Sequence, residues 1–360
     1  MPSFFDNMLN DLKNQIKDIE RVREANFRLL HLYSLYLNER ADFISPEMVR
    51  EVAQIGEFSE EDAFLILFSE ACGIHPTDGG EDENFFRHFL SPSVRCLDPA
   101  RYRSDPYYKH ICFPNVNTGN WELRTDKLKA YQPFIWDDVR PDEQLRELPP
   151  LGYFKEEFSY PVVLEDNREW MLVTPNEVET IRPAVAAARG RVVTFGLGLG
   201  YFPFMASLKP EVEAVTVVER DPNVISLFEK YILPQFSYRD KIRLVNCDAF
   251  DYLESTMKTE NFDYAYADIW HDAGDGVPLY LRFNKYEEVF PKTKFDYWIE
   301  DTMLSYLRWY DYEHLPGDVR MVSRWLSNGN TKQRAVFLSA DDYLRWQAGE
   351  EIVTDDGDEK

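Results

Sequence analysis

Cysteine and long apolar runs are both scarce in this 360-residue chain. Its four cysteines are scattered and form no Cys-x-x-Cys pair, which is typical of reduced thiols and not of a disulfide framework. The longest apolar stretch, residues 64–68, is far shorter than the roughly 20 residues of a membrane-spanning helix. The first residues have the composition of neither a signal peptide nor a basic transit segment. We therefore expect a cytoplasmic protein that has no membrane partner.

Basic residues are also few: 40 Lys and Arg stand against 64 Asp and Glu, which gives a formal net charge of −24. Proteins that bind nucleic acid draw their affinity from clustered Lys and Arg, and no such cluster occurs, so the composition argues against a nucleic-acid partner. No regular spacing of His, Cys, Asp and Glu indicates a metal site, and none is predicted. The hydrophobic content of 44% is ample for a globular protein of about two domains.

A third absence is the glycine spacing of the dinucleotide-binding fingerprint. Residues 192–200 read Val-Val-Thr-Phe-Gly-Leu-Gly-Leu-Gly, a hydrophobic strand that breaks into three alternate glycines before a helical segment at 202–208. Glycine permits positive φ and lets a ligand lie against the main chain, while the following helix offers unpaired N–H groups. The dinucleotide fingerprint needs its third glycine where this chain has Tyr201, which argues against nicotinamide and flavin cofactors. The motif indicates either another kind of nucleotide cradle or a packing turn.

Polar residues stand at the carboxyl ends of the strands that are predicted around this motif. Strict alternation of strands and helices predicts right-handed crossovers and a parallel sheet that binds ligands outside the carboxyl ends of its strands. Glu219 ends the second strand about 20 residues past the glycines, where an acid is placed to accept hydrogen bonds from ribose hydroxyls. The predicted strands are 192–195, 214–219, 242–246 and 262–267.

The glycine spacing, the acid that closes the second strand and the Asp-Ala that closes the third resemble the class I S-adenosylmethionine-dependent methyltransferases. More narrowly, residues 160–300 are similar to the spermidine-synthase-like branch of that superfamily. The resemblance implies an α/β fold, namely a Rossmann-like methyltransferase fold with a mainly parallel sheet flanked by helices, here preceded by an N-terminal helical domain. It also implies S-adenosylmethionine as the cofactor.

The resemblance further assigns cofactor-binding residues. It implies that the three glycines face the methionine part and ribose of the donor and that Glu219 holds the ribose diol. Asp248 would accept from the adenine amino group and the Ala249 amide would donate to a ring nitrogen, although Asp248 also suits a plain helix N-cap. The complete cofactor-binding set comprises Phe195, Gly196, Gly198, Gly200, Glu219, Arg220, Asp248, Ala249, Asp268 and Trp270.

The loop after the fourth strand carries the candidate catalytic residues, which are Asp268, His271 and Asp272. Methyl transfer is an in-line displacement that needs mainly alignment, and a base is required only when the acceptor is protonated. His271 could take a proton near neutral pH, with either carboxylate orienting it. The position of Asp268 is set by the end of the strand. The alternative for His271 and Asp272 is an ordinary solvated turn.

Two departures from the polyamine synthases favour methyl transfer. Leu199 stands where those enzymes usually carry an acid that would repel a donor with its carboxylate intact, and residues 268–272 contain no Asp-Pro. We therefore expect a methyltransferase that acts on an unidentified small-molecule acceptor. The alternatives are an aminopropyltransferase and a non-catalytic nucleotide-binding regulatory module.

Four regions are predicted along the chain. Residues 1–90 are expected to form a helical bundle whose apolar stripes serve either as its core or as a homodimer interface. Residues 91–150 are expected to be an aromatic-rich irregular connector that lies over the crevice or against the bundle. Residues 151–310 form the predicted catalytic domain, entered by a hairpin and a helix with a capping box at Thr174. Residues 311–360 are expected to be a helical extension with a frayed acidic end.

Overall fold

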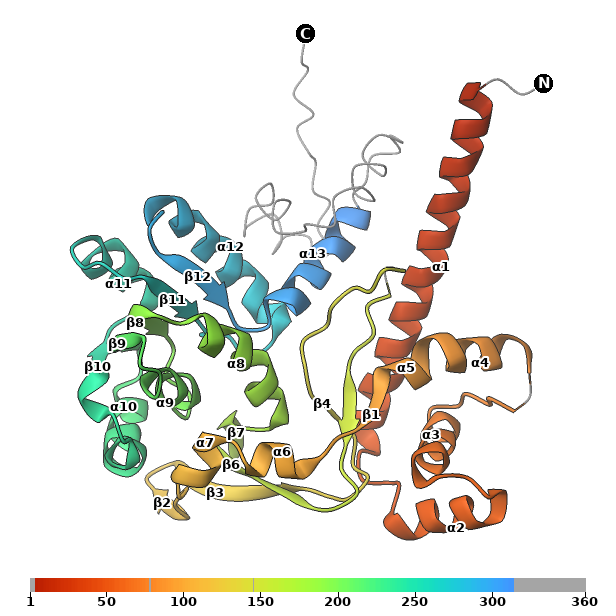
Figure 1. The fold of residues 1–360 in the computed structure, drawn as a ribbon, viewed down its shortest axis with the longest axis horizontal. Coiled ribbons are helices and arrows are strands. Elements are labelled where there is room, and N and C mark those ends of the chain that lie inside the picture. The colour runs from red at the N-terminus through yellow and green to blue at the C-terminus, as the bar shows by residue number, and fades with distance from the viewer. Residues whose placement is uncertain (1–3, 78, 145, 314–360) are drawn as a thin grey trace.

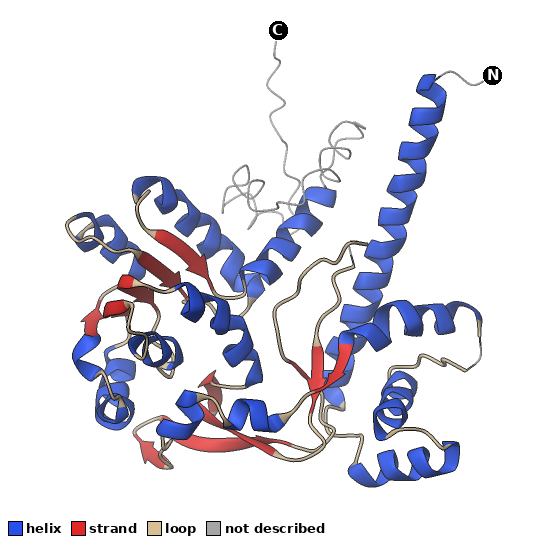
Figure 2. Cartoon of the chain, viewed as in Figure 1, coloured by secondary structure: helices blue, strands red, loops and turns tan. Residues whose placement is uncertain are grey.

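The computed structural model describes residues 4–77, 79–144 and 146–313. The predicted C-terminal extension therefore lies outside the described residues, except for its first three positions. Figure 1 shows a helical N-terminal region on one side and a parallel sheet with its helices on the other. An antiparallel sheet runs along the base of the molecule between them, as the strands of Figure 2 show.

The N-terminal region begins with a single long helix. Serine side chains cap the two helices that follow it, because Ser45 accepts a hydrogen bond from the Met48 amide and Ser59 from the Asp62 amide. Buried aromatic rings hold the region together, including Phe64, which stacks on Tyr153 at 3.8 Å between centroids. The helices are α1 (Phe4–Glu39), α2 (Pro46–Gly56), α3 (Glu60–Ala71), α4 (Gly80–Phe85), the π-helical turn Phe86–Leu90 and α5 (Ser91–Ser93).

Residues 91–150 contain more regular structure than the sequence predicts, so the expected irregular connector is corrected. A small sheet of β1 (Val94–Cys96), β5 (Leu151–Tyr153) and β4 (Phe134–Ile135) packs with the N-terminal helices. Two short helices follow β1, α6 (Pro99–Arg103) and α7 (Pro106–His110). The sequence hides these elements because each is short, and the partner strand of β1 lies more than 50 residues away in the chain.

The predicted hairpin forms two strands of a four-stranded antiparallel sheet. Its turn is Asp166–Asn167, and both residues have positive φ, as the tight turn of a two-residue hairpin requires. The sequence missed the neighbouring strand, which pairs with the hairpin over eight residues. In order across the sheet, the strands are β2 (Val116–Thr118), β3 (Trp121–Leu128), β6 (Phe158–Glu165) and β7 (Arg168–Leu172).

Residues 190–297 contain a five-stranded parallel sheet in a Rossmann-like α/β fold, as predicted. Its strand order is β10-β9-β8-β11-β12, so the first strand lies in the middle and the strand order reverses between β8 and β11. Phe195 at the end of β8 lies beside Val218 on one neighbour and Ala267 on the other, so these strands end nearly level. The strands are β8 (Gly190–Phe195), β9 (Val212–Glu219), β10 (Ile242–Asn246), β11 (Tyr264–Ala267) and β12 (Lys294–Tyr297).

Helices cover both faces of this sheet, and alternate residues of each strand point to opposite cores. On β8, Val192 joins a core with α8, α9 and α10, whereas Val193 joins a core with α11 and α12. The helices are α8 (Pro175–Ala187), α9 (Tyr201–Ser207), α10 (Pro222–Leu227), α11 (Ala249–Glu254), α12 (Ala273–Val289) and α13 (Glu300–Glu313). Short turns lie at Phe228–Ile232, Leu233–Gln235, Arg239–Lys241 and Thr256–Lys258. Among the described helices, none combines the length and apolar character that crossing a bilayer requires.

Candidate functional site

A cavity of about 500 Å³ lies at the carboxyl ends of the parallel strands, beside the point where the strand order reverses. This is the position where open parallel sheets place their ligands. Strand β7 of the antiparallel sheet forms one wall, and the loops after β8, β9, β10 and β11 form the others. The predicted residues that line the cavity are Gly196, Gly198, Glu219, Arg220, Asp248, Ala249, Asp268, Trp270 and His271.

Two of the three glycines face this cavity. Gly196 has φ +94°, and a Cβ there would lie 1.9 Å from the backbone oxygen of Asp268, so no other residue fits. Gly198 also lines the cavity and lies under Met171 of β7. Gly200 does not line it: a Cβ there would lie 2.3 Å from the ring of Phe228. The motif is therefore part cradle and part packing turn, the two alternatives that the sequence left open.

Glu219 is buried at the end of β9 and is held from two sides. One of its oxygens accepts a hydrogen bond from the Leu197 amide at 3.1 Å, and the other accepts from the Asp221 amide at 2.8 Å. The carboxylate thereby fixes the glycine loop to the end of the neighbouring strand. A carboxylate has about four lone-pair sites, so Glu219 retains acceptor capacity toward the cavity.

Asp248 has the N-cap role that the sequence offered as its alternative. One of its oxygens accepts from the Phe250 amide at 2.8 Å and from the Asp251 amide at 3.3 Å, which caps α11. The side chain is exposed, and it lines the cavity together with buried Ala249. Capping uses one oxygen, so the second oxygen and the Ala249 amide are placed side by side for a ligand.

Asp268 ends β11 with its backbone tied to the sheet, because its amide donates to the Phe195 carbonyl at 2.8 Å. Burial, together with the smaller effect of the charges of Glu177 and Glu219, raises the pKa of its carboxyl to about 8. No hydrogen bond or ion pair engages this side chain among the described residues. At neutral pH Asp268 is therefore largely protonated, and a cation in the cavity would draw it toward the charged form.

Glu177 is a cavity residue that the sequence analysis did not assign. It is the third residue of α8 and completes the predicted capping box, accepting from the Thr174 amide at 2.7 Å and from the Thr174 hydroxyl. Burial raises the pKa of Glu177 to about 7. The capping box was visible in the sequence, but only the tertiary structure brings this carboxylate beside Asp268.

The positions of His271 and Asp272 differ from those expected of a catalytic pair inside the cavity. The His271 side chain is 70% exposed and stands at the rim, with its Nδ1 3.3 Å from Asp275. Asp272 does not line the cavity: it caps α12 by accepting from the Gly274 and Asp275 amides at 2.7 and 3.2 Å. Helix α12 begins at Ala273, so His271 and Asp272 form the exposed start of a helix.

Two further predicted residues are buried away from the cavity. Phe195 is fully buried in the core beneath the cavity floor and contributes only its backbone to the site. The Leu199 side chain is also buried, and it lines small neighbouring pockets but not the main cavity. The residue at position 199 therefore does not select donors by their charge in that cavity. This removes the missing acid at Leu199 as an argument against aminopropyl transfer.

Tryptophans contribute to the cavity wall from three directions. Trp270 is 5% exposed, and its indole nitrogen has no hydrogen-bond partner among the described residues. Trp298 follows β12 and donates to the Thr180 hydroxyl on α8 at 2.9 Å. Trp170 of β7 packs edge-on against Trp121 at 5.3 Å between ring centroids. Only Trp270 was predicted, because the other two reach the site from elements that are distant in sequence.

No protein-family model and no curated protein sequence matches this chain. Among solved structures, it is similar to spermidine synthase from Thermotoga maritima, with 16% identity and a TM-score of 0.24 over 32% of this chain and 44% of that one. It is also similar to a spermidine synthase in complex with the transition state analogue AdoDATO, with 17% identity and a TM-score of 0.23 over 31% and 43% of the two chains. The chain thus spans less than half the length of these structures. The fold assignment rests on the observed sheet order and not on these values.

Proposed function

We propose that this protein is an S-adenosylmethionine-dependent transferase that methylates a small molecule. The observation that carries the proposal is the convergence of the glycine loop, Glu219, Asp248 with Ala249, and Asp268 on one cavity at the reversal point of the sheet. These groups come from the ends of four different strands. A packing turn alone would not require polar groups from the other three strands to face the same space.

The residues present fit an adenosine-containing sulfonium. Gly196 and Gly198 line the cavity without a side chain between it and the main chain, and Glu219 keeps lone pairs for a ribose diol. The exposed oxygen of Asp248 and the amide of Ala249 present an acceptor beside a donor, which suits an adenine edge. When bound, S-adenosylmethionine would supply an electrophilic methyl group on its sulfonium.

Asp268 is the proposed base. The carboxyl group of Asp268 is half-buried and has a pKa of about 8, and a nearby cation would favour its charged form. In that form it can accept a proton from the acceptor. Glu177 provides a second carboxylate in the same cavity with a pKa of about 7. Neither group needs to act if the acceptor arrives deprotonated, since alignment then suffices.

Aminopropyl transfer is the second candidate, and the carboxyl groups of the cavity are the observation that supports it. Glu177, Glu219 and Asp268 face a common space, and such a wall suits a donor that keeps its ammonium group but lacks the carboxylate. The cavity also contains Arg220 and Arg282, which could receive the carboxylate of intact S-adenosylmethionine. The charge pattern thus accommodates both donors, and binding must decide between them.

Calorimetric titration with S-adenosylmethionine, its decarboxylated analogue and NAD in parallel tests the proposal. We expect micromolar affinity, about −8 kcal/mol, for S-adenosylmethionine and none for NAD. Tighter binding of the decarboxylated compound would replace methyl transfer with aminopropyl transfer. If neither sulfonium compound binds, the proposed function is wrong.

A further inference from the structure

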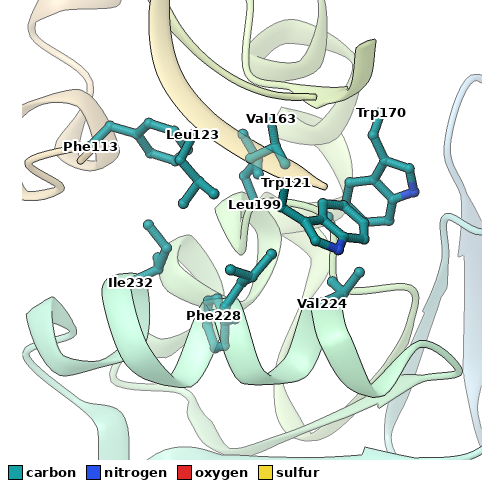
Figure 3. Close-up of a pocket in the computed structure, with 11 residues that line it drawn as sticks. Phe113, Trp121, Leu123, Val163, Trp170, Leu199, Val224, Phe228 and Ile232 are labelled. Atoms are coloured by element: carbon teal, nitrogen blue, oxygen red, sulfur yellow. The ribbon is translucent and has the colours of Figure 1, made fainter. Parts of the chain in front are cut away.

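A second, smaller pocket adjoins the proposed donor cavity and differs from it in chemistry. It lies between the antiparallel sheet and the helical segment after β9, and Figure 3 shows that apolar side chains surround it. Trp121, Leu123 and Trp170 enter from the sheet, while Val224 and Phe228 enter from the opposite side. Its lining contains no charged side chain, so it offers nothing to the sugar, the carboxylate or the sulfonium of the donor.

The two spaces share Gly198 and Trp170 as common walls. Trp170 occupies an unusual backbone position, because β6 and β7 slip in register there. Met171 pairs with Val163 and Glu169 pairs with Leu164, which leaves Trp170 between them without a partner on β6. Such a bulge on an edge strand redirects one side chain, and bulges of this kind are common beside active sites.

The redirected indole forms the partition between the two spaces. It is only half-buried, and it rests edge-on against buried Trp121 with an interplanar angle of 80°. The apolar pocket has a volume of about 20 Å³ in this state, which is room for a methyl-sized group. Because Trp170 borders the cavity of about 500 Å³ on its other side, rotation of its indole would join the two spaces.

We propose that this pocket holds the methyl-sized end of a short alkyl arm of the molecule that accepts the transferred group. This inference rests on the proposed function, because it treats the neighbouring cavity as the donor site. Of the residues assigned to the donor, Glu219, Asp248 and Ala249 do not line the pocket, and Gly198 is shared by both spaces. Donor and arm would therefore lie on opposite sides of Gly198. The acceptor is then amphipathic, with its reacting end in the acidic cavity and its arm between Trp121 and Val224.

Quenching of tryptophan fluorescence by a brominated alkyl probe tests the pocket without knowledge of the acceptor. Bromine quenches an indole on contact, and two tryptophans line this pocket. We expect saturable quenching by bromoethane, whose size suits the pocket, and only weak, unsaturable quenching by the polar control 2-bromoethanol. Val224→Phe fills the pocket from a buried position and should weaken probe binding at least about tenfold.

Leu227→Phe provides a second blocking variant from a half-buried position that accommodates a larger ring more easily. Val289→Phe is the matched control, since Val289 is 53% exposed on α12. Unchanged probe binding in both blocking variants, or equal saturation by the polar probe, would overturn the assignment. Titration of the same proteins with S-adenosylmethionine separates the two proposals. Binding of the alkyl probe at this pocket without binding of any sulfonium compound would refute the proposed function. Binding of the sulfonium compound without saturable quenching would refute the apolar pocket.

Discussion

Asp268 connects the chemistry of the site to the stability of the fold. Its folded pKa of about 8 lies above the ordinary value of 3.8, so the neutral form favours the folded state. Its contribution to stability is complete below about pH 4 and is lost as the pH rises through 8. We expect Asp268→Asn to be more stable than the wild type by a margin that grows from pH 5 to pH 9. Urea unfolding at both pH values measures this margin.

The same variant tests the role of base. If Asp268 accepts the proton, Asp268→Asn should lower turnover by about 10²- to 10⁴-fold, and wild-type activity should rise toward pH 8. The exposed Asp240→Asn is the control and should change neither quantity. A stability margin that stays constant with pH would show that Asp268 does not titrate as described.

Glu219 tests the proposed contact with the ribose. Glu219→Gln keeps the shape of the side chain but removes its charge, so we expect the binding of S-adenosylmethionine to weaken by about 1.5–3 kcal/mol. Calorimetry measures this loss. Glu213→Gln, at an exposed position of the same strand, should have no effect. Unchanged affinity in Glu219→Gln would limit Glu219 to holding the glycine loop.

Single residues were predictable where one local pattern fixed both position and chemistry. Glu219 and Asp248 follow strands that the hydrophobic pattern identifies, and Asp268 does the same. Glu177 has an equally clear local signal, but its capping box explains it without any ligand. Trp170 has no signal at all, because a register slip between two strands directs it to the site.

At the level of helices and strands, the glycine loop contains residues that line the cavity and one residue, Gly200, that serves packing. Gly200 is the N-cap residue of α9, with φ +78°, and it lies against the ring of Phe228. We expect Gly200→Ala to lower the free energy of unfolding by about 1–3 kcal/mol, because a Cβ both strains the backbone and meets the ring. Thermal denaturation measures the loss.

Gly119→Ala is the control for backbone strain alone, since Gly119 has φ +63° and open space around it. It should cost less than Gly200→Ala. The affinity for S-adenosylmethionine should stay within about threefold in both variants, because neither glycine lines the donor cavity. Loss of binding in a stable Gly200→Ala variant would instead return Gly200 to the cofactor site.

For the chain as a whole, a clamp joins residues 136–150 to the start of α13. Asp138 is buried and accepts from the Asp301 amide at 3.1 Å and from the Thr302 amide at 2.8 Å. It therefore caps a helix that lies more than 160 residues further along the chain. Burial raises the pKa of Asp138 to about 6.

We expect Asp138→Ala to lower the free energy of unfolding by about 1–3 kcal/mol, because two buried amides lose their acceptor. Hydrogen exchange should accelerate at Asp301 and Thr302. Asp301→Ala is the control: its carboxylate pairs with Arg140 at the surface and should matter by less than about 1 kcal/mol. Equal effects of the two variants would refute the cap.

The homodimer through the N-terminal helices stays a prediction.

Local patterns in this sequence were enough to define the helix caps, the hairpin turn, the parallel strands and the Rossmann-like fold. Each depends on hydrogen bonds or periodicity within a few neighbouring residues, so the chain encodes it over a short stretch. The pairing of β3 with the hairpin, the approach of Glu177 to Asp268 and the direction of Trp170 depend on contacts between distant segments. Only the folded chain fixes these, because many sequences with the same local patterns would pack in other ways.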